Sequence, residues 1–375
     1  MINILIGGDV CPIGRALPFF VSGNVEQNFS DIIKEFSAAD FNVVNLECCL
    51  IEKNTPIDKD GPVLGVPVAC VNGLKKLRVN AVNFANNHCL DHGETGLKKT
   101  LEALNKSAIL CFGAGMNLQD AGRMIIVNIK DKRIAFLGYA EHEFSIAGIR
   151  SGGANPLDIT DFIDKLNKYR NKYDFLIVLL HAGKEYYPYP SPRLAKLCHF
   201  FAEQGANAII CQHSHCVGCF EIYKGVPIVY GQGNLIFDRP TTKKYWHQGV
   251  LVRLKIDDNL KTEVELVPYF QFTKDFPGVK ILDLKGNDFM EQFYRRSRDI
   301  IYEEFIEQKW IEHCIKEKYT YFSRLYGHNR ILRKLNKIFH FTDWVYSKEI
   351  KLMIRNVVEC ESHREVLETL WRLEH

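Results

Sequence analysis

The sequence predicts an α/β domain with a largely parallel or mixed sheet covered by helices, followed by a helical C-terminal region. Three observations support this. Short apolar runs alternate with segments of helical spacing over most of the chain. Two runs, 249–256 and 262–268, are joined by a short connection and predict an antiparallel pair. From residue 289 onward helical patterns dominate. We therefore expect a domain at 1–270, a linker at 271–288 and a helical region at 289–375.

Composition limits the classes of protein that need consideration. The 375 residues are 46% hydrophobic and 25% charged, which is ordinary for a globular protein with an ample core. The net charge of +3, from 48 basic and 45 acidic residues, is too balanced to indicate a nucleic-acid partner. The chain begins Met1-Ile2-Asn3 without a charged segment or a long apolar one, so we expect no secretory signal. The twelve cysteines are scattered, as is typical of reduced thiols in a cytoplasmic protein.

The first two predicted strands each end in a carboxylate. Residues 3–8 form the first strand, and a Gly-Gly turn presents Asp9. An aspartate at a strand end is by itself more often a turn residue. After a helix predicted at 25–39, residues 43–46 form the second strand and end at Glu47. A carboxylate beside a buried apolar run needs a charge partner or a metal, so Glu47 is the stronger candidate.

The third predicted strand, 80–84, leads into a dense group of polar residues. Asn87, His88 and Asp91 follow it within a few positions. Asn87 could offer its amide oxygen to a cation, and His88 could transfer protons. A helix from about residue 94 to 105 follows.

Two further apolar strands end in histidines. The run 174–180 ends at His181, and the run 208–211 leads into Gln212-His213-Ser214-His215. Two imidazoles separated by one residue can converge on a metal from one loop. Such a pair alone is more often two surface or core histidines whose hydrogen bonds are already satisfied. The interpretation of the pair as metal ligands is stronger here because other predicted strands also end in residues that can bind a metal.

Together the strand ends carry mixed oxygen and imidazole donors, which suit a divalent ion such as Mn, Fe or Zn, and two such ions if a carboxylate bridges them. Glu47 is the best bridging candidate. The candidate residues are Asp9, Glu47, Asn87, His88, His181, His213, His215 and Asn234.

These residues also carry a family resemblance. The series Gly8-Asp9, Asn45-Leu46-Glu47, Asn86-Asn87-His88, His181-Ala182-Gly183 with Glu185, His213-Ser214-His215 and Gly233-Asn234 resembles the CapA family of capsule and poly-γ-glutamate biosynthesis. That family looks like a branch of the calcineurin-like metallophosphoesterases. The resemblance covers residues 2–270 and implies a four-layered α/β/β/α sandwich with a C-terminal helical appendage.

The resemblance further implies roles for individual residues. Asp9 and His215 would hold one divalent ion, and Asn87, His181 and His213 the other, with Glu47 bridging. The remaining roles concern chemistry and substrate: His88 would protonate the leaving group, Asp91 would orient His88, and Glu185 and Asn234 would line the substrate side.

Cysteines stand at two positions of interest. Metallophosphoesterases typically have Asp-x-His at the first motif, whereas Cys11 stands here at the place of the histidine. It is either a soft ligand or, as we favour, a small buried residue. The pair Cys216 and Cys219 could be a redox dithiol or half of a zinc knuckle, but we favour packing thiols near a turn.

Residues 324–337 carry five basic residues and no acidic one. An amphipathic helix over 324–339 would contact an anionic membrane surface or a protein partner. We favour the alternative, a helical appendage with a solvated basic face.

We therefore expect a dinuclear metal-dependent hydrolase of the CapA type that uses a metal-bound hydroxide on a phosphoester or a γ-glutamyl amide of a small-molecule or polymer substrate. The alternatives are a non-catalytic accessory protein of a polymer synthase and a peripheral membrane adaptor that acts through the C-terminal helices.

Overall fold

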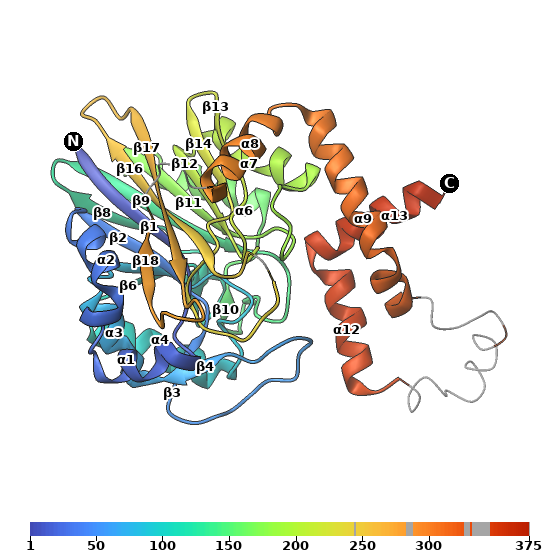
Figure 1. Ribbon diagram of the computed structural model, residues 1–375, viewed down its shortest axis with the longest axis horizontal. Coiled ribbons are helices and arrows are strands. Elements are labelled where there is room, and N and C mark those ends of the chain that lie inside the picture. Colours follow the sequence, from blue (N-terminus) through green and yellow to red (C-terminus); the bar gives the residue numbers. More distant parts are fainter. Residues whose placement is uncertain (244, 283–287, 326–330, 332–345, 375) are drawn as a thin grey trace.

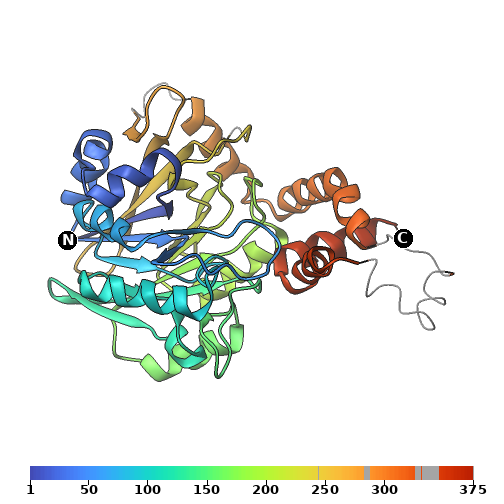
Figure 2. The same ribbon diagram turned by 90° about the horizontal axis from the view of Figure 1, so that it is seen from below.

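Two β-sheets packed face to face form the centre of the molecule (Figure 1). The computed structural model describes residues 1–243, 245–282, 288–325, 331 and 346–374. Helices cover the outer face of each sheet, and further helices from the C-terminal part of the chain stand beside the sandwich (Figure 2). The expected α/β/β/α sandwich with a C-terminal helical appendage is confirmed.

The first sheet has the strand order β18-β17-β16-β1-β2-β5-β6, with β15 also paired to β1. Neighbours among β1, β2, β5 and β6 run parallel, whereas β16, β17 and β18 pair antiparallel. The predicted antiparallel pair is thus confirmed as β16 and β17. The strands are β1 (Ile2–Cys11), β2 (Phe41–Leu46), β5 (Ala81–Asn83), β6 (Leu110–Phe112), β15 (Asn234–Phe237), β16 (Gln248–Ile256), β17 (Thr262–Gln271) and β18 (Val279–Ile281).

The second sheet has the order β13-β14-β12-β11-β9-β8, with a parallel centre and antiparallel edges. Its strands are β8 (Ile125–Ile129), β9 (Lys132–Ala140), β11 (Phe175–His181), β12 (Ala208–Gln212), β13 (Phe220–Tyr223) and β14 (Val226–Tyr230). Two small two-stranded sheets join β3 (Cys49–Ile51) to β4 (Gly65–Pro67) and β7 (Ala114–Gly115) to β10 (Gly153–Ala154).

The apolar runs of the central strands are continuous because both faces of each sheet are buried. In β1, Ile4 and Ile6 face the core between the sheets, whereas Leu5 faces the helices outside. Phe41 and Phe136 stack across the sheet interface with ring centroids 5.5 Å apart. The first sheet is covered by α1 (Leu17–Ser22), α2 (Glu26–Ser37), α3 (Val71–Lys76) and α4 (Gly93–Lys106), and the second by α6 (Ile159–Tyr169) and α7 (Pro192–Gln204), with short turns at η1 (Gly14–Ala16), η2 (Val68–Cys70) and α5 (Leu118–Ala121).

The C-terminal part is helical, as predicted, but the sandwich extends further than residue 270. Strand β18 lies within the stretch that we expected to be a linker. Helix α8 (Asp288–Asp299) inserts Phe289 and Phe293 into the core between the sheets. Buried Arg296 of α8 donates to the carbonyls of Val217 and Gly218, both at 3.1 Å. We therefore describe β18 and α8 as parts of the sandwich.

The remaining helices, α9 (Glu303–Leu325), α12 (Lys348–Glu359) and α13 (Glu361–Glu374), share a small core of their own. Trp310 and Tyr321 of α9 pack there with Leu367 of α13 and with Tyr187 of the sandwich. None of the helices in the described residues is long and apolar enough to cross a membrane. The basic helix predicted over 324–339 lies almost entirely outside the described residues, so its role as a contact surface stays a prediction.

Candidate metal centre

The carboxyl ends of parallel strands from both sheets meet at one edge of the sandwich, where open α/β folds place their sites. Strands β1, β2 and β5 of the first sheet and β11 and β12 of the second all deliver side chains there. Six predicted ligands are buried together at this edge, namely Asp9, Glu47, Asn87, His181, His213 and His215.

Two groups of ligand atoms share one carboxylate. Glu47 groups with His181 and His213, and also with Asp9 and His215, and in each group the ligand atoms lie within 4.8 Å of one another. The Glu47 Oε1 atom lies 3.4 Å from His181 Nε2 and 3.6 Å from His215 Nε2. A carboxylate shared in this way has the position needed to bridge two ions.

Asn87 joins the first group. Its Oδ1 lies 3.0 Å from His181 Nε2, and His213 Nδ1 lies 3.0 Å from the same nitrogen. One ring N–H cannot satisfy both neighbours, because a neutral imidazole carries a single proton. A cation among these three atoms would satisfy all of them.

The strongest test of whether a metal fits is Glu47 itself. Its side chain is fully buried, and neither carboxylate oxygen has a hydrogen-bond partner among the described residues. Burial raises the pKa of Glu47 well above its ordinary value, and the nearby Asp9 raises it further. An unpaired buried carboxylate is costly, and coordination to a cation removes that cost. The residues present therefore fit divalent ions of the Mn, Fe or Zn type.

The protonation states of two of the three histidines agree with metal binding. Burial lowers the pKa values of His181 and His213 well below the ordinary value, which keeps both rings in the neutral form that binds metals. His215 differs: burial lowers its pKa, but Glu47 and Asp9 outweigh this and raise it to about 10. The carboxylates thus create a local field that attracts positive charge.

A layer of amides holds these side chains in place. Asn45 Nδ2 donates to Asp9 Oδ1 at 2.8 Å, and Asn86 Nδ2 donates to Asn45 Oδ1 at 3.1 Å. His213 and His215 have left-handed φ angles of 84° and 51°, a strained conformation that is typical of functional sites. Asn45 and Asn86 were not among the residues that we predicted for the site, although both stand inside its sequence motifs.

Asn234, which we expected to line the substrate side, contacts one of the candidate ligands. It is fully buried, and its Oδ1 lies 2.9 Å from His215 Nδ1. Its amide nitrogen donates to the carbonyl of Trp246 at 3.2 Å, which fixes the oxygen toward the imidazole. Asn234 therefore orients His215 so that Nε2 faces Glu47, a common device around metal-binding histidines.

His88 and Asp91 form a pair next to the ligand cluster. His88 Nδ1 lies 2.6 Å from Asp91 Oδ2. Asp91 also accepts from Lys59 Nζ at 2.7 Å and from the Leu64 N–H at 2.6 Å. Burial, reinforced by Lys59, lowers the pKa of His88. With Nδ1 held by Asp91, Nε2 is the nitrogen through which His88 can exchange a proton.

Glu185 lines a cavity of about 230 Å³ together with His88, and its role on the substrate side stays a prediction. Glu143 lines the same cavity, and its Oε1 lies 3.9 Å from His213 Nε2. We missed Glu143 and Lys59 in the sequence. Glu143 could have been found, because it follows β9, whose carboxyl end lies beside that of β11.

The three cysteines of interest pack in the protein interior and do not belong to a group of metal-ligand atoms among the described residues. Cys11 is fully buried in the core under the helices of the first sheet and belongs to neither ligand group among the described residues. Cys216 and Cys219 are buried too, and Cys219 Sγ donates to the carbonyl of Pro188 at 3.1 Å. All twelve cysteines are free. This geometry agrees with the packing role that we favoured for all three.

Known proteins resemble about half of this chain. It is 30% identical over 206 residues to "Capsule biosynthesis protein CapA" of Bacillus anthracis, covering 53% of this chain and 49% of the relative. It is 30% identical over 201 residues to "PGA biosynthesis protein CapA" of Bacillus subtilis strain 168, covering 53% of this chain and 52% of the relative. The matched part of the chain thus spans about half the length of either relative.

Solved structures give a more distant likeness. The 5'-nucleotidase precursor from Thermus thermophilus is 12% identical with a TM-score of 0.45, over 74% of this chain and 56% of that chain.

The family model described as "Bacterial capsule synthesis protein PGA_cap" matches residues 3–239. This range spans well over half of the chain and contains every ligand of the candidate metal centre, and it confirms the resemblance to the CapA family. The chain belongs to the bacterial capsule synthesis protein family PGA_cap.

Proposed function

We propose that this protein is a metal-dependent hydrolase in the formation of a bacterial capsule or poly-γ-glutamate, acting on a phosphoester or a γ-glutamyl amide. The observation that carries the proposal is Glu47, a fully buried carboxylate without hydrogen-bond partners that is shared by two groups of ligand-type atoms. Scaffolding alone gives no reason to bury such a group at the meeting point of five strand ends.

The side chains of the cluster have distinct tasks in this proposal. Asp9, Glu47 and His215 would hold one ion, and Glu47, Asn87, His181 and His213 the other. When bound, the ions would supply an activated water and neutralise negative charge on the substrate. Asn45, Asn86 and Asn234 keep the ligands in position through the hydrogen bonds described above.

His88 would move the proton. Asp91 accepts from its Nδ1, which fixes the ring and stabilises the charged form while Nε2 delivers a proton to the leaving group. Lys59 balances the charge of Asp91, since both side chains are almost completely buried, at 2% and 0% exposed. Glu185 and Glu143 stand on the same side as the leaving group.

Hydrolysis assays test the proposal. The purified chain, supplied with Mn²⁺, is expected to hydrolyse p-nitrophenyl phosphate, bis-p-nitrophenyl phosphate or γ-glutamyl-p-nitroanilide, and His213→Ala is expected to abolish the activity. His88→Gln should lower the rate about 10²- to 10⁴-fold on a phosphoester with a poor leaving group, such as phenyl phosphate in place of p-nitrophenyl phosphate, which is the usual contribution of a general acid. It should do so without loss of bound metal.

His199→Gln is the matched control, because His199 lies on α7 and bonds Glu221 at 2.8 Å, away from the cluster. An equal loss of activity in His199→Gln and His88→Gln would contradict the role of His88. Absence of turnover on all three substrate classes would favour a second function, a non-catalytic accessory protein of a polymer synthase. A relative from Mycobacterium tuberculosis strain H37Rv, 28% identical over 51% of this chain and 56% of its own length, bears the name "Probable polyglutamine synthesis accessory protein".

A further inference from the structure

The cavity beside His88 has walls from two parts of the chain. The sandwich contributes His88, Glu143, Lys184 and Glu185, and the loop before β4 contributes Lys59 and Asp60. The opposite wall comes from the C-terminal helices, which contribute Glu317, Tyr321, Asn356 and His363. These helices begin well beyond the family match, which ends at residue 239.

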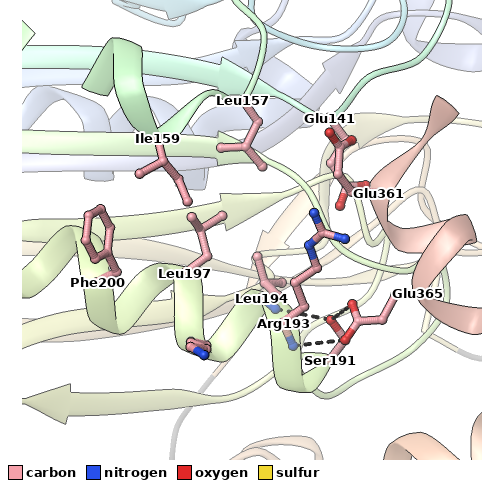
Figure 3. Close-up of a pocket in the computed structure, with 11 residues that line it drawn as sticks. Glu141, Leu157, Ile159, Ser191, Arg193, Leu194, Leu197, Phe200, Glu361 and Glu365 are labelled. Carbon is pink, nitrogen blue, oxygen red and sulfur yellow. Dashed lines mark hydrogen bonds between the residues drawn. The ribbon is translucent and has the colours of Figure 1, made fainter. Parts of the chain in front are cut away.

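Several contacts fix the C-terminal helices in this position. Tyr187, two residues after Glu185, is part of the core of α9, α12 and α13. Glu365 of α13 accepts from Ser191 Oγ at 2.5 Å and from the Arg193 N–H at 2.9 Å, as Figure 3 shows. Glu361 bonds His142, and Lys348 of α12 bonds Asp58 of the loop before β4. These contacts therefore hold the C-terminal helices in place as one wall of the cavity.

The helices place polar groups in the wall. Tyr321 Oη lies 2.6 Å from His363 Nδ1, and Lys184 Nζ lies 6.0 Å from the centre of the Tyr321 ring. Asn356 is only 6% exposed, and its Oδ1 has no hydrogen-bond partner among the described residues. A buried acceptor of this kind calls for a donor from a ligand or from water.

Among the described residues, acidic groups outnumber basic ones in the lining. Lys59 is already paired with Asp91, which leaves Lys184 against Asp60, Glu143, Glu185 and Glu317. Hydrogen-bond acceptors and negative charge therefore dominate this side of His88. A ligand group that donates hydrogen bonds and carries positive charge is the best complement.

We infer that this cavity receives the leaving group of the substrate, that the leaving group is compact and carries an ammonium group, and that Glu317 and Asn356 of the C-terminal helices select it. The inference rests on the proposed hydrolase function, because it takes His88 as the proton donor to that leaving group. The volume of about 230 Å³ lies below the range of about 300–1,000 Å³ that is usual for larger ligands, so the leaving group is small.

Equilibrium binding tests the inference. Calorimetry on the full chain with Mn²⁺ compares O-phosphoethanolamine with ethyl phosphate, which shares the phosphate but has no amine. The unaltered protein should bind O-phosphoethanolamine about tenfold more tightly, the effect of one charge-assisted hydrogen bond. In Glu317→Gln and in Asn356→Leu the preference should fall to about twofold or less, with the affinity for ethyl phosphate unchanged. Glu312→Gln, on the exposed side of the same helix, should keep the preference.

The outcomes separate the two proposals. Equal affinity for both ligands in the unaltered protein, or an equal preference in Glu317→Gln and Glu312→Gln, would overturn the inference and leave the hydrolase proposal standing. A preference that depends on Glu317, without turnover on any of the three substrate classes named above, would support the inference as a binding property and overturn the hydrolase proposal. Failure of both ligands to bind would overturn the inference, and the hydrolysis assays would then decide the hydrolase proposal separately.

Discussion

The ligand cluster and the cavity beside it are built by different means. Five of the six candidate ligands stand at or beyond the end of a parallel strand, and Asp9 lies within β1 two residues before its end, so the sheets themselves bring the six side chains together. The outer wall of the cavity depends on α9, α12 and α13, which reach it through a small separate core and a few polar anchors. In our proposal the chemistry therefore depends on the part that matches the family, and selection of the leaving group depends on the part outside it.

The largest effect is expected from a substitution of Glu47 in the ligand cluster. Glu47→Gln keeps the shape but removes the charge that would bridge two ions. Activity should fall by about three orders of magnitude, because several kcal/mol of transition-state stabilisation would be lost. In protein treated with a chelator the same variant should be at least as stable as the unaltered chain, since it no longer buries a carboxylate without hydrogen bonds. Hydrolysis assays measure the loss of activity and thermal unfolding of the chelated proteins measures the stability, and a less stable chelated variant would count against this interpretation of Glu47.

The C-terminal helices can be destabilised without a change in the ligand cluster. Trp310 is 1% exposed, and its Nε1 donates to Thr369 Oγ1 at 3.0 Å. Trp310→Ala should destabilise the packing of α9 against α13 by about 4 kcal/mol, as is usual for a buried aromatic residue. Limited proteolysis should then cut within the C-terminal helices, while the bound metal stays constant. Metal lost in parallel with the helices would show that the two regions are not separable.

The stability of the protein should depend on pH through Glu141, which lies where the sandwich meets the C-terminal helices. Burial, and to a smaller extent the neighbouring Glu361 of α13, raises the pKa of Glu141 to about 8 (Figure 3). A carboxyl whose pKa is higher in the folded state stabilises the fold below its unfolded pKa of about 4.5 and loses that contribution as the pH rises toward 8. Relative to Glu141→Gln, the unaltered protein should therefore lose on the order of 2 kcal/mol between pH 5 and pH 9. Urea unfolding across this range checks the sign, and a constant difference would refute it.

The smallest effect is expected at Asn234. Asn234→Ala leaves every ligand in place but removes the acceptor for His215 Nδ1. Metal affinity should fall about tenfold, at the low end for loss of such a supporting group. Competition with a fluorescent chelator measures the affinity. An unchanged affinity would mean that the loop strain alone orients His215.

The clustering of the candidate ligands could be predicted from the sequence because strand ends are a local signal. An apolar run followed by Glu47, His181 or His213 marks both the strand and the edge at which it ends. The contact of Asn234 with His215 could not be predicted, because the sequence does not reveal which of two neighbouring polar groups faces the other.

The wall of the cavity could not be predicted for a different reason. Glu317, Asn356 and His363 lie on helices whose pattern shows which face is apolar but not where the helices dock. Their position depends on long-range contacts such as that of Tyr187 with Trp310, whose rings lie 5.4 Å apart. The sequence predicted the helices themselves but gave no sign that β18 and α8 belong to the sandwich.

The metal content of the purified protein tests the central claim most directly. Chains expressed without a chelator and analysed by plasma mass spectrometry should carry about two divalent ions each, since Glu47 has ligands on both sides. Asp9→Asn should lower this number toward one, and His199→Gln should leave it unchanged. Unaltered protein that binds no divalent ion, even after dialysis against Mn²⁺, Fe²⁺ or Zn²⁺, would contradict the assignment of this cluster as a metal centre.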